Sequence, residues 1–194
     1  MPPLQPVTRA LLLINVAVFF LARLFGGGIE SVFALWPLGT NFLPWQVATY
    51  AFLHGSFEHL FFNMLGLWMF GSELERIWGE KRFLQFYAAS VLAAALAQLV
   101  VTAVMGSVYP TVGASGGLFG LLFAFAVMFP NRVILLFFVI PMKARYLVAL
   151  YGLLELYLGV SGHDSSVAHF AHLGGMVGGF ALIMYWRSTV RPRR

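Results

Sequence analysis

Long apolar runs separated by short polar turns constrain this sequence more than any other feature. Charged residues make up 10% of the chain and hydrophobic residues 60%, against about 25% and about 45–50% in soluble domains. Because so few polar residues cannot cover the apolar ones, we expect lipid to surround most of the chain. A membrane-crossing helix needs about 20 residues, so six helices with short connections would use most of the 194.

The runs predict an all-α bundle of six membrane-spanning helices in one membrane domain, residues 1–194. The expected helices are about 8–25, 57–72, 83–105, 114–129, 144–160 and 167–186. The first run is followed by no clear cleavage site, so we interpret it as a span and not as a signal peptide.

Three connections between the runs have a character of their own. Residues 26–56 combine Gly and Pro with many aromatic side chains, which predicts a long structured loop in the membrane interface. Residues 73–82 are expected to form a charged connection. The apolar segment 133–140 is too short to span a bilayer and predicts a dip or an interfacial piece that ends at Pro141.

The positions of Lys and Arg predict the orientation. With a cytoplasmic N-terminus, 11 of the 12 fall in cytoplasmic segments and only Arg23 lies outside. The eleven are Arg9, Arg76, Lys81, Arg82, Arg132, Lys143, Arg145, Arg187, Arg191, Arg193 and Arg194. Since cytoplasmic loops are enriched in Lys and Arg, we expect a multi-pass cell-membrane protein with both termini in the cytoplasm. This topology explains the net charge of +5 without a nucleic-acid partner.

Four polar residues fall at a similar predicted depth, in the outer part of the bilayer. Ser115 begins the fourth helix, His172 lies in the first turns of the sixth, and His59 and Asn63 lie in the first two turns of the second. Polar residues inside a membrane usually face the bundle interior or a water-filled cavity. The sequence therefore predicts a shared polar cavity that opens to the outer side.

Small residues give two of these helices a reason to touch. The pairs Gly116/Gly120 and Gly175/Gly179 have the small-xxx-small spacing that lets helix backbones approach closely. Such pairs are common in membrane helices and often only pack. Here they predict that the fourth helix lies against the sixth, which would bring the Ser115 hydroxyl toward His172.

A serine hydroxyl is a weak nucleophile that needs a base within hydrogen-bond reach, and His172 can serve. The oxyanion formed in acyl transfer needs donors, which His59, Asn63 and the Ser115 backbone N–H can supply; Gly113 would let the backbone turn there. The outer-side carboxylates are Glu30, Glu58, Glu155 and Asp164. Glu155 could orient the histidine or be a structural partner, but we favour a Ser-His dyad without a carboxylate.

Three motifs in this order resemble the rhomboid family of intramembrane serine proteases. They are HGSFEHLFFN at 54–63, GASG at 113–116 and AHLGG at 171–175, followed by Gly179. Each motif is weak alone, but three in family order on alternate helices are specific. The resemblance covers nearly the whole chain, including the long first loop and the Glu75-Arg76 turn.

The resemblance implies a serine endopeptidase that cleaves transmembrane protein substrates in or near their membrane-spanning segments, without a cofactor or metal. It makes Ser115 the nucleophile, His172 the general base and then acid, and His59, Asn63 and the Ser115 N–H the oxyanion site. Phe119 stands where some members have a tyrosine stacked on the histidine, so it could stack but has no hydroxyl. A supporting role for His169 and a purely structural one are both compatible with the sequence, and the same holds for His54.

Two other readings are weaker. A catalytically dead relative that binds membrane clients would be expected to lack Ser115 or His172, and this chain has both. A metal-dependent enzyme or transporter could use His54, His59, His169 and His172, but the zinc-protease pattern H-E-x-x-H is absent. The chain has no cysteine for a thiolate site, and its only aspartate, Asp164, does not provide the pair that an aspartyl protease needs.

Overall fold

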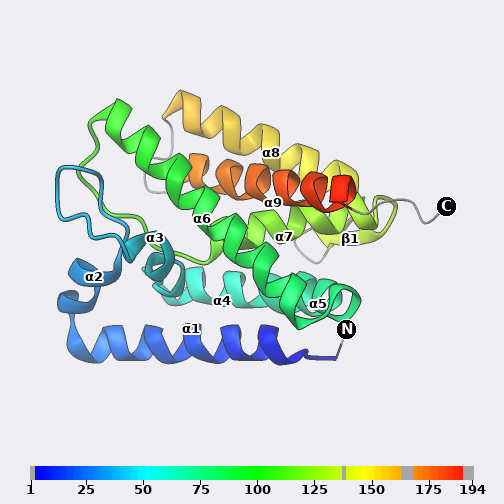
Figure 1. The fold of residues 1–194 in the computed structure, drawn as a ribbon, viewed down its shortest axis with the longest axis horizontal. Helices are drawn as coiled ribbons and strands as arrows, with labels where there is room; N and C mark the ends of the chain where they lie inside the picture. The colour runs from blue at the N-terminus through cyan, green and yellow to red at the C-terminus, as the bar shows by residue number, and fades with distance from the viewer. Residues whose placement is uncertain (1–2, 137–138, 163–167, 190–194) are drawn as a thin grey trace.

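Helices form nearly all of the regular structure in the computed structural model, which describes residues 3–136, 139–162 and 168–189. The start of α1 and the end of α9 lie at the same end of the bundle, and the segment with α2 and α3 lies at the other (Figure 1). The helices are α1 (Pro6–Phe25), α2 (Gly27–Phe33), α3 (Gln46–Thr49), the 3-10 helix η1 (Tyr50–Phe52), α4 (Phe57–Gly66), the π-helix η2 (Leu67–Gly71), α5 (Ser72–Trp78), α6 (Glu80–Met105), α7 (Ser115–Met128), α8 (Ala144–Ser161) and α9 (His169–Thr189).

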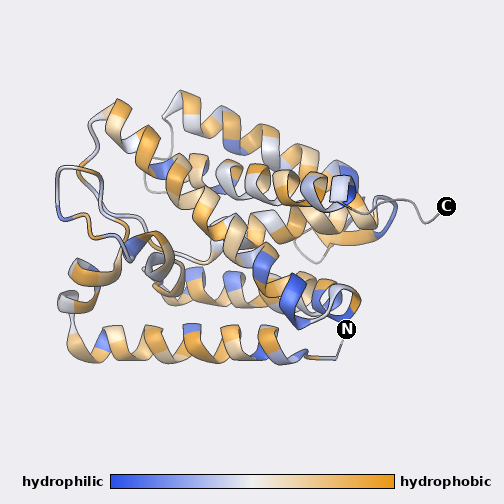
Figure 2. Cartoon of the chain, viewed as in Figure 1, coloured by the Kyte–Doolittle hydropathy of each residue, from blue (hydrophilic) through white to orange (hydrophobic). Residues whose placement is uncertain are grey.

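The bundle exposes apolar side chains and buries polar ones, as is expected of a protein that is surrounded by lipid. Large apolar side chains stand outward on several helices, among them Leu24 at 79% exposed and Val104 at 82%. Thr8, Asn15 and Ser90 are fully buried instead. Hydrophilic residues gather at the end of the bundle where α1 begins, over α5 and the start of α6 (Figure 2).

Two helices, α1 and α6, are long and apolar enough to cross a membrane, and α7 is a shorter apolar helix. The predicted ranges 8–25, 83–105, 114–129 and 144–160 agree with α1, α6, α7 and α8 to within about three residues. The predicted start of the last helix at 167 lies outside the described residues, as do Asp164 and the arginines of the tail. The count of six spans stays a prediction.

Close approach of backbones sets the position of α9 between α6 and α7. A Cβ on Gly175 would overlap the backbone carbonyl of Gly116 in α7, and one on Gly174 or Gly178 would meet alanines of α6. The predicted contact between the fourth and sixth helices is therefore present. Gly179 was expected in the same contact, but it faces the Phe86 ring of α6. Gly179 lies one turn after Gly175 and about 40° further around α9, where the nearest side chain comes from α6.

The expected charged connection 73–82 is wrong in most of its length. The helix that begins at Phe57 continues through η2 and α5 to Trp78, and only Gly79, at φ 77°, separates it from α6. Glu75, 1% exposed, accepts hydrogen bonds from the backbone N–H groups of Val7 and Thr8 and from the Thr8 hydroxyl. This carboxylate therefore satisfies donors at the N-terminus of α1, where negative charge is favoured.

Residues 133–136 and 140–143 form two strands, which the expectation of a dip or interfacial piece over 133–140 did not include. Strand β1 (Val133–Leu136) pairs antiparallel with β2 (Ile140–Lys143), and Pro141, expected to end the segment, lies within β2 opposite Leu135. Proline is tolerated here because a two-stranded sheet has an open edge on which a missing N–H costs nothing.

The segment 26–56 also holds more helix than the sequence predicts, since α2, α3 and η1 lie in it. Gln46 organises its centre and is fully buried. Its Oε1 accepts from the Trp36 and Leu43 backbone N–H groups, and its Nε2 donates to the carbonyls of Val32 and Asn41. One amide side chain thus ties together backbone that is distant in sequence, next to the bridge between Leu35 and Thr111.

We predict that Gln46→Glu lowers the melting temperature in detergent by at least about 5 °C. The change keeps the size of the side chain but removes both donors and buries a charge, which costs about 2–5 kcal/mol. Thermal unfolding followed by circular dichroism measures the effect. Gln5→Glu is the matched control, because the Gln5 amide bonds only to an exposed carbonyl. A Gln46→Glu protein that melts with the parent would contradict this role.

Candidate active site

Ser115 and His172 lie within hydrogen-bonding distance, as the packing of their helices predicts. The Ser115 Oγ is 2.8 Å from the Nε2 of His172. Ser115 is the first residue of α7, and His172 lies in the first turn of α9. The Gly116–Gly175 contact holds these two helix starts together, so the hydroxyl and the imidazole meet without a change in either helix.

Phe119 limits the orientation of the His172 ring. The two rings are stacked, with centroids 4.2 Å apart and planes inclined by 4°. Phe119 lies one turn after Ser115 on α7, so one helix carries both the hydroxyl and the ring that faces the imidazole. This is the stacking that the sequence predicts, and it needs no hydroxyl on the ring.

Gly113 lets His59 lie against the backbone beside Ser115. Its φ of 131° is a conformation that side chains rarely adopt. A Cβ there would lie 2.8 Å from the Cε1 and Nε2 of His59 and 3.6 Å from the Ser115 Oγ. The Gly113 N–H donates to the Tyr50 carbonyl at 3.0 Å, which anchors the turn to η1.

His59, Ser115 and His172 line one cavity of about 940 Å³. The segment from Gly106 to Val112 forms much of its wall, with Gly55 and Gln98. The shared polar cavity is thus present for three of the four predicted residues. Asn63 is not among the lining residues, but its Nδ2 is buried without a hydrogen-bond partner in the described part of the chain. Buried amide donors are usually satisfied, so this one is available to a bound group.

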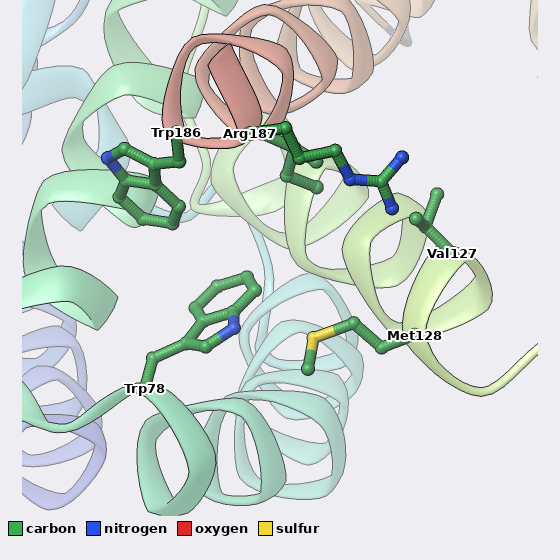
Figure 3. A pocket seen from close by; sticks show the side chains of 6 residues that line it. Trp78, Val127, Met128, Trp186 and Arg187 are labelled. Atoms are coloured by element: carbon green, nitrogen blue, oxygen red, sulfur yellow. The ribbon is translucent and has the colours of Figure 1, made fainter. Parts of the chain in front are cut away.

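Two further cavities lie away from Ser115. A cavity of about 470 Å³ is lined by Trp78, Trp186 and Arg187, which come from α5 and α9 (Figure 3). A cavity of about 320 Å³ between α1 and the 26–56 segment is almost wholly apolar. Neither is lined by a histidine or a carboxylate, so neither offers a nucleophile with a base.

The sequence favoured a Ser-His dyad without a carboxylate, but in the structure a carboxylate lies beside His172. The Oε2 of Glu155 in α8 lies 2.9 Å from the Nδ1 of His172 and 2.7 Å from the Nδ1 of His169. The distance from Glu155 to His172 is within the range of a hydrogen bond, but the contact at Nδ1 does not have the geometry of one. Glu155 is 7% exposed and His169 5%, so the cluster is buried. An acid inside an apolar run was the signal that could have found it.

His54 lies beside this site and not in a metal cluster with the other histidines. Its ring centroid is 5.0 Å from that of His59. Burial, and then the nearby charge of His59, lower the pKa of His54 to about 4, against the opposing effect of a hydrogen bond to the Phe52 backbone. His54 is therefore neutral at pH 7. Because the unfolded chain takes up this proton near pH 6.5, the folded state loses stability as the pH falls from 6.5 toward 4.

Within the described residues, the one group of three potential metal ligands is Glu155, His169 and His172, whose ligand atoms lie within 4.8 Å of one another. His54 and His59, which the hypothesis of a metal-dependent enzyme also includes, are not in this group. The separations between the carboxylate and the two Nδ1 atoms, 2.7 and 2.9 Å, are those of direct polar contacts.

Comparison with known proteins gives a consistent result. The family model of the Rhomboid domain matches residues 41–189. The chain is 32% identical to "Rhomboid protease GluP" of Bacillus subtilis over 89% of its own length and 33% of that protein's. It is 34% identical to "Rhomboid protein 1, mitochondrial" of Saccharomyces cerevisiae over 95% of its length and 54% of the relative's. It is 34% identical to "Putative rhomboid protease YdcA" of Bacillus subtilis over 71% of its own length and 65% of the relative's. The chain therefore spans between about a third and two thirds of these relatives.

We predict that Gly113→Ala destabilises the protein more than Gly79→Ala does. Both positions have positive φ, but a Cβ at Gly79 meets nothing within 4 Å, whereas one at Gly113 meets His59. Strain alone costs about 1–3 kcal/mol, and the steric contact adds to it. Denaturation in detergent measures both variants.

A double-mutant cycle with His59→Ala separates the two causes. If the His59 ring lies where the structure has it, Gly113→Ala costs less in the His59→Ala background, by about 0.5–3 kcal/mol. Equal costs in the two backgrounds would mean that His59 does not lie against Gly113.

Proposed function

The chain belongs to the Rhomboid family, and on that premise we propose that it is an intramembrane serine endopeptidase acting on transmembrane protein substrates. The observation that carries the proposal is the 2.8 Å separation between the Ser115 Oγ and the His172 Nε2. A half-buried hydroxyl paired with a buried imidazole, both lining one cavity, is the minimum that acyl transfer requires.

In the proposed reaction the Ser115 Oγ attacks the scissile carbonyl carbon while the His172 Nε2 takes the hydroxyl proton. His172 then gives this proton to the leaving amine, and the C–N bond breaks to leave an acyl-serine. A water molecule, deprotonated by His172, hydrolyses the ester and restores the hydroxyl. The cavity of about 940 Å³ has room for a short extended stretch of substrate chain next to Ser115.

The oxyanion of the tetrahedral intermediate would be held by His59, Asn63 and the Ser115 N–H. The closeness of His59 to Gly113 and the unpartnered Nδ2 of Asn63 support this role. Ser115 is in the first turn of α7, where backbone N–H groups have no acceptor within the helix and the helix dipole favours negative charge. Donors of this kind are each worth about 2.7–4 kcal/mol in a transition state.

We further propose that six helical segments of one membrane domain cross the membrane: α1, the α4–α5 path, α6, α7, α8 and α9. The exposed apolar side chains of α1 and α6 support contact with lipid. Since Lys and Arg concentrate at the end where α1 begins and α9 ends, that end would face the cytoplasm. Ser115 then lies toward the outer side of the cell membrane. The +5 charge would serve this orientation, with no nucleic-acid partner.

We predict that Ser115→Ala and His172→Ala each lower the rate of cleavage of a transmembrane reporter by a factor on the order of 10⁴ or more, because each removes an obligatory half of one reacting unit. Both variants should still insert and keep their helical content. Cleavage in proteoliposomes, read by gel and normalised to folded protein, gives the rates.

Ser188→Ala is the matched control, since Ser188 lies near the far end of α9 and its hydroxyl only bonds to the Tyr185 carbonyl. It should cleave at the parent rate. Parental activity in the Ser115→Ala protein would refute the proposal.

A further inference from the structure

Glu155 is a buried carboxylate on a helix whose neighbouring side chains stand outward. Leu153, Leu154 and Leu156 are 68%, 43% and 47% exposed, whereas Glu155 is 7% exposed. A carboxylate inside a membrane bundle is costly unless charged or polar groups satisfy it. Here a single oxygen, Oε2, faces the Nδ1 atoms of His169 and His172 at 2.7 and 2.9 Å.

We propose that Glu155 is a positioning residue for His172, which holds the imidazole in the tautomer that can accept the Ser115 proton. The inference rests on the proposed function of Ser115 and His172. It replaces the Ser-His dyad expected from the sequence with a set in which a carboxylate stands behind the histidine.

The tautomer follows from the chemistry of the two partners. A neutral imidazole has one N–H donor and one acceptor nitrogen, and an ionised carboxylate only accepts. The nitrogen that faces Glu155 is Nδ1, so the proton is favoured there. Nε2 then presents its lone pair to the Ser115 hydroxyl 2.8 Å away. With the proton on Nε2 instead, His172 would be a donor toward Ser115 and could not act as its base.

The carboxylate also matters after the proton has moved. When His172 takes the Ser115 proton it becomes an imidazolium, and a negative charge 2.9 Å from Nδ1 stabilises this cation, because both side chains are buried. Protonated His172 then carries a proton on both nitrogens, and the proton on Nδ1 lies beside the Glu155 carboxylate. Stacking on Phe119 holds the ring plane while the protons move.

His169 gives the carboxylate a fixed position. It lies one turn before His172 on α9, and its Nδ1 contacts the same Oε2 at 2.7 Å. If Glu155 served only to tie α8 to α9, the contact with His169 would be sufficient. The second contact, with the histidine that meets Ser115, is the one that a positioning role requires.

The test compares Glu155→Gln, Glu155→Leu and Glu155→Asp with the parent in kcat and KM for a transmembrane reporter. We expect Glu155→Leu to lower kcat by about 10- to 1000-fold, less than the loss on removal of His172, while KM changes by less than about twofold. Glu155→Gln keeps the side-chain volume and should also lower kcat. Glu155→Asp keeps the charge and should recover part of the loss. Leu153→Ala, on the lipid-facing side of α8, is the matched control.

A second readout does not depend on cleavage. Nitrogen NMR of protein labelled with ¹⁵N-histidine distinguishes the tautomers, and His172→Ala identifies the His172 signals among the five histidines. The parent should have His172 with its proton on Nδ1, and Glu155→Leu, which removes the acceptor, should shift it toward Nε2. Melting temperatures record any loss of folded protein.

An unchanged His172 tautomer in Glu155→Leu would overturn the inference. So would a kcat that falls only in proportion to the folded fraction. Failure of the proposed function is recognised separately: Ser115→Ala would then cleave like the parent, and the NMR comparison would still decide whether Glu155 sets the His172 tautomer.

Discussion

The contact between Gly116 of α7 and Gly175 of α9 determines the geometry of the rest of the site. A Cβ on Gly175 would overlap the Gly116 carbonyl, so any larger residue would force the helices apart. Ser115 precedes Gly116 directly, and His172 lies one turn before Gly175. The 2.8 Å separation of Oγ and Nε2 is therefore a consequence of backbone packing. Small residues of α6 pack closely against the same two helices.

The polar groups of the site are held from several elements inside an apolar bundle. The Tyr50 carbonyl anchors Gly113, the Gly113 turn accommodates His59, and Phe119 stacks on His172. Tyr50 itself is fixed by a hydrogen bond from its hydroxyl to the Val91 carbonyl of α6. Each contact restricts a group that would take part in one step of the proposed reaction, so little rearrangement would be needed before attack.

The ranges of α1, α6, α7 and α8 and the approach of Ser115 to His172 could be predicted because hydrophobic runs, glycine spacing and polar residues in apolar segments are local signals. The strands β1 and β2 were not predicted, since a short apolar run carries no period that distinguishes a strand from a dip. The spacing of the glycines also predicted that Gly179 of α9 contacts α7, whereas this residue faces α6. Spacing gives the residues that share a face of one helix, but it does not say which neighbour that face meets.

The contact of Glu155 with His172 was missed for the same reason. The two residues lie on helices whose relative rotation depends on packing over the whole interface. Glu155 was one of four outer-side carboxylates that could orient His172, but the choice between that role and a purely structural one requires coordinates. The sequence order of motifs, in contrast, was sufficient to identify the Rhomboid family, which the match over residues 41–189 confirms.

The most direct test of the account is the site of covalent reaction with a serine-directed fluorophosphonate, mapped by peptide mass spectrometry on the protein in detergent. Activation of Ser115 by His172 predicts one adduct, on the peptide that contains Ser115, and its loss in His172→Ala. An adduct on another serine with Ser115 unmodified, or equal labelling of Ser115 with and without His172, would contradict it.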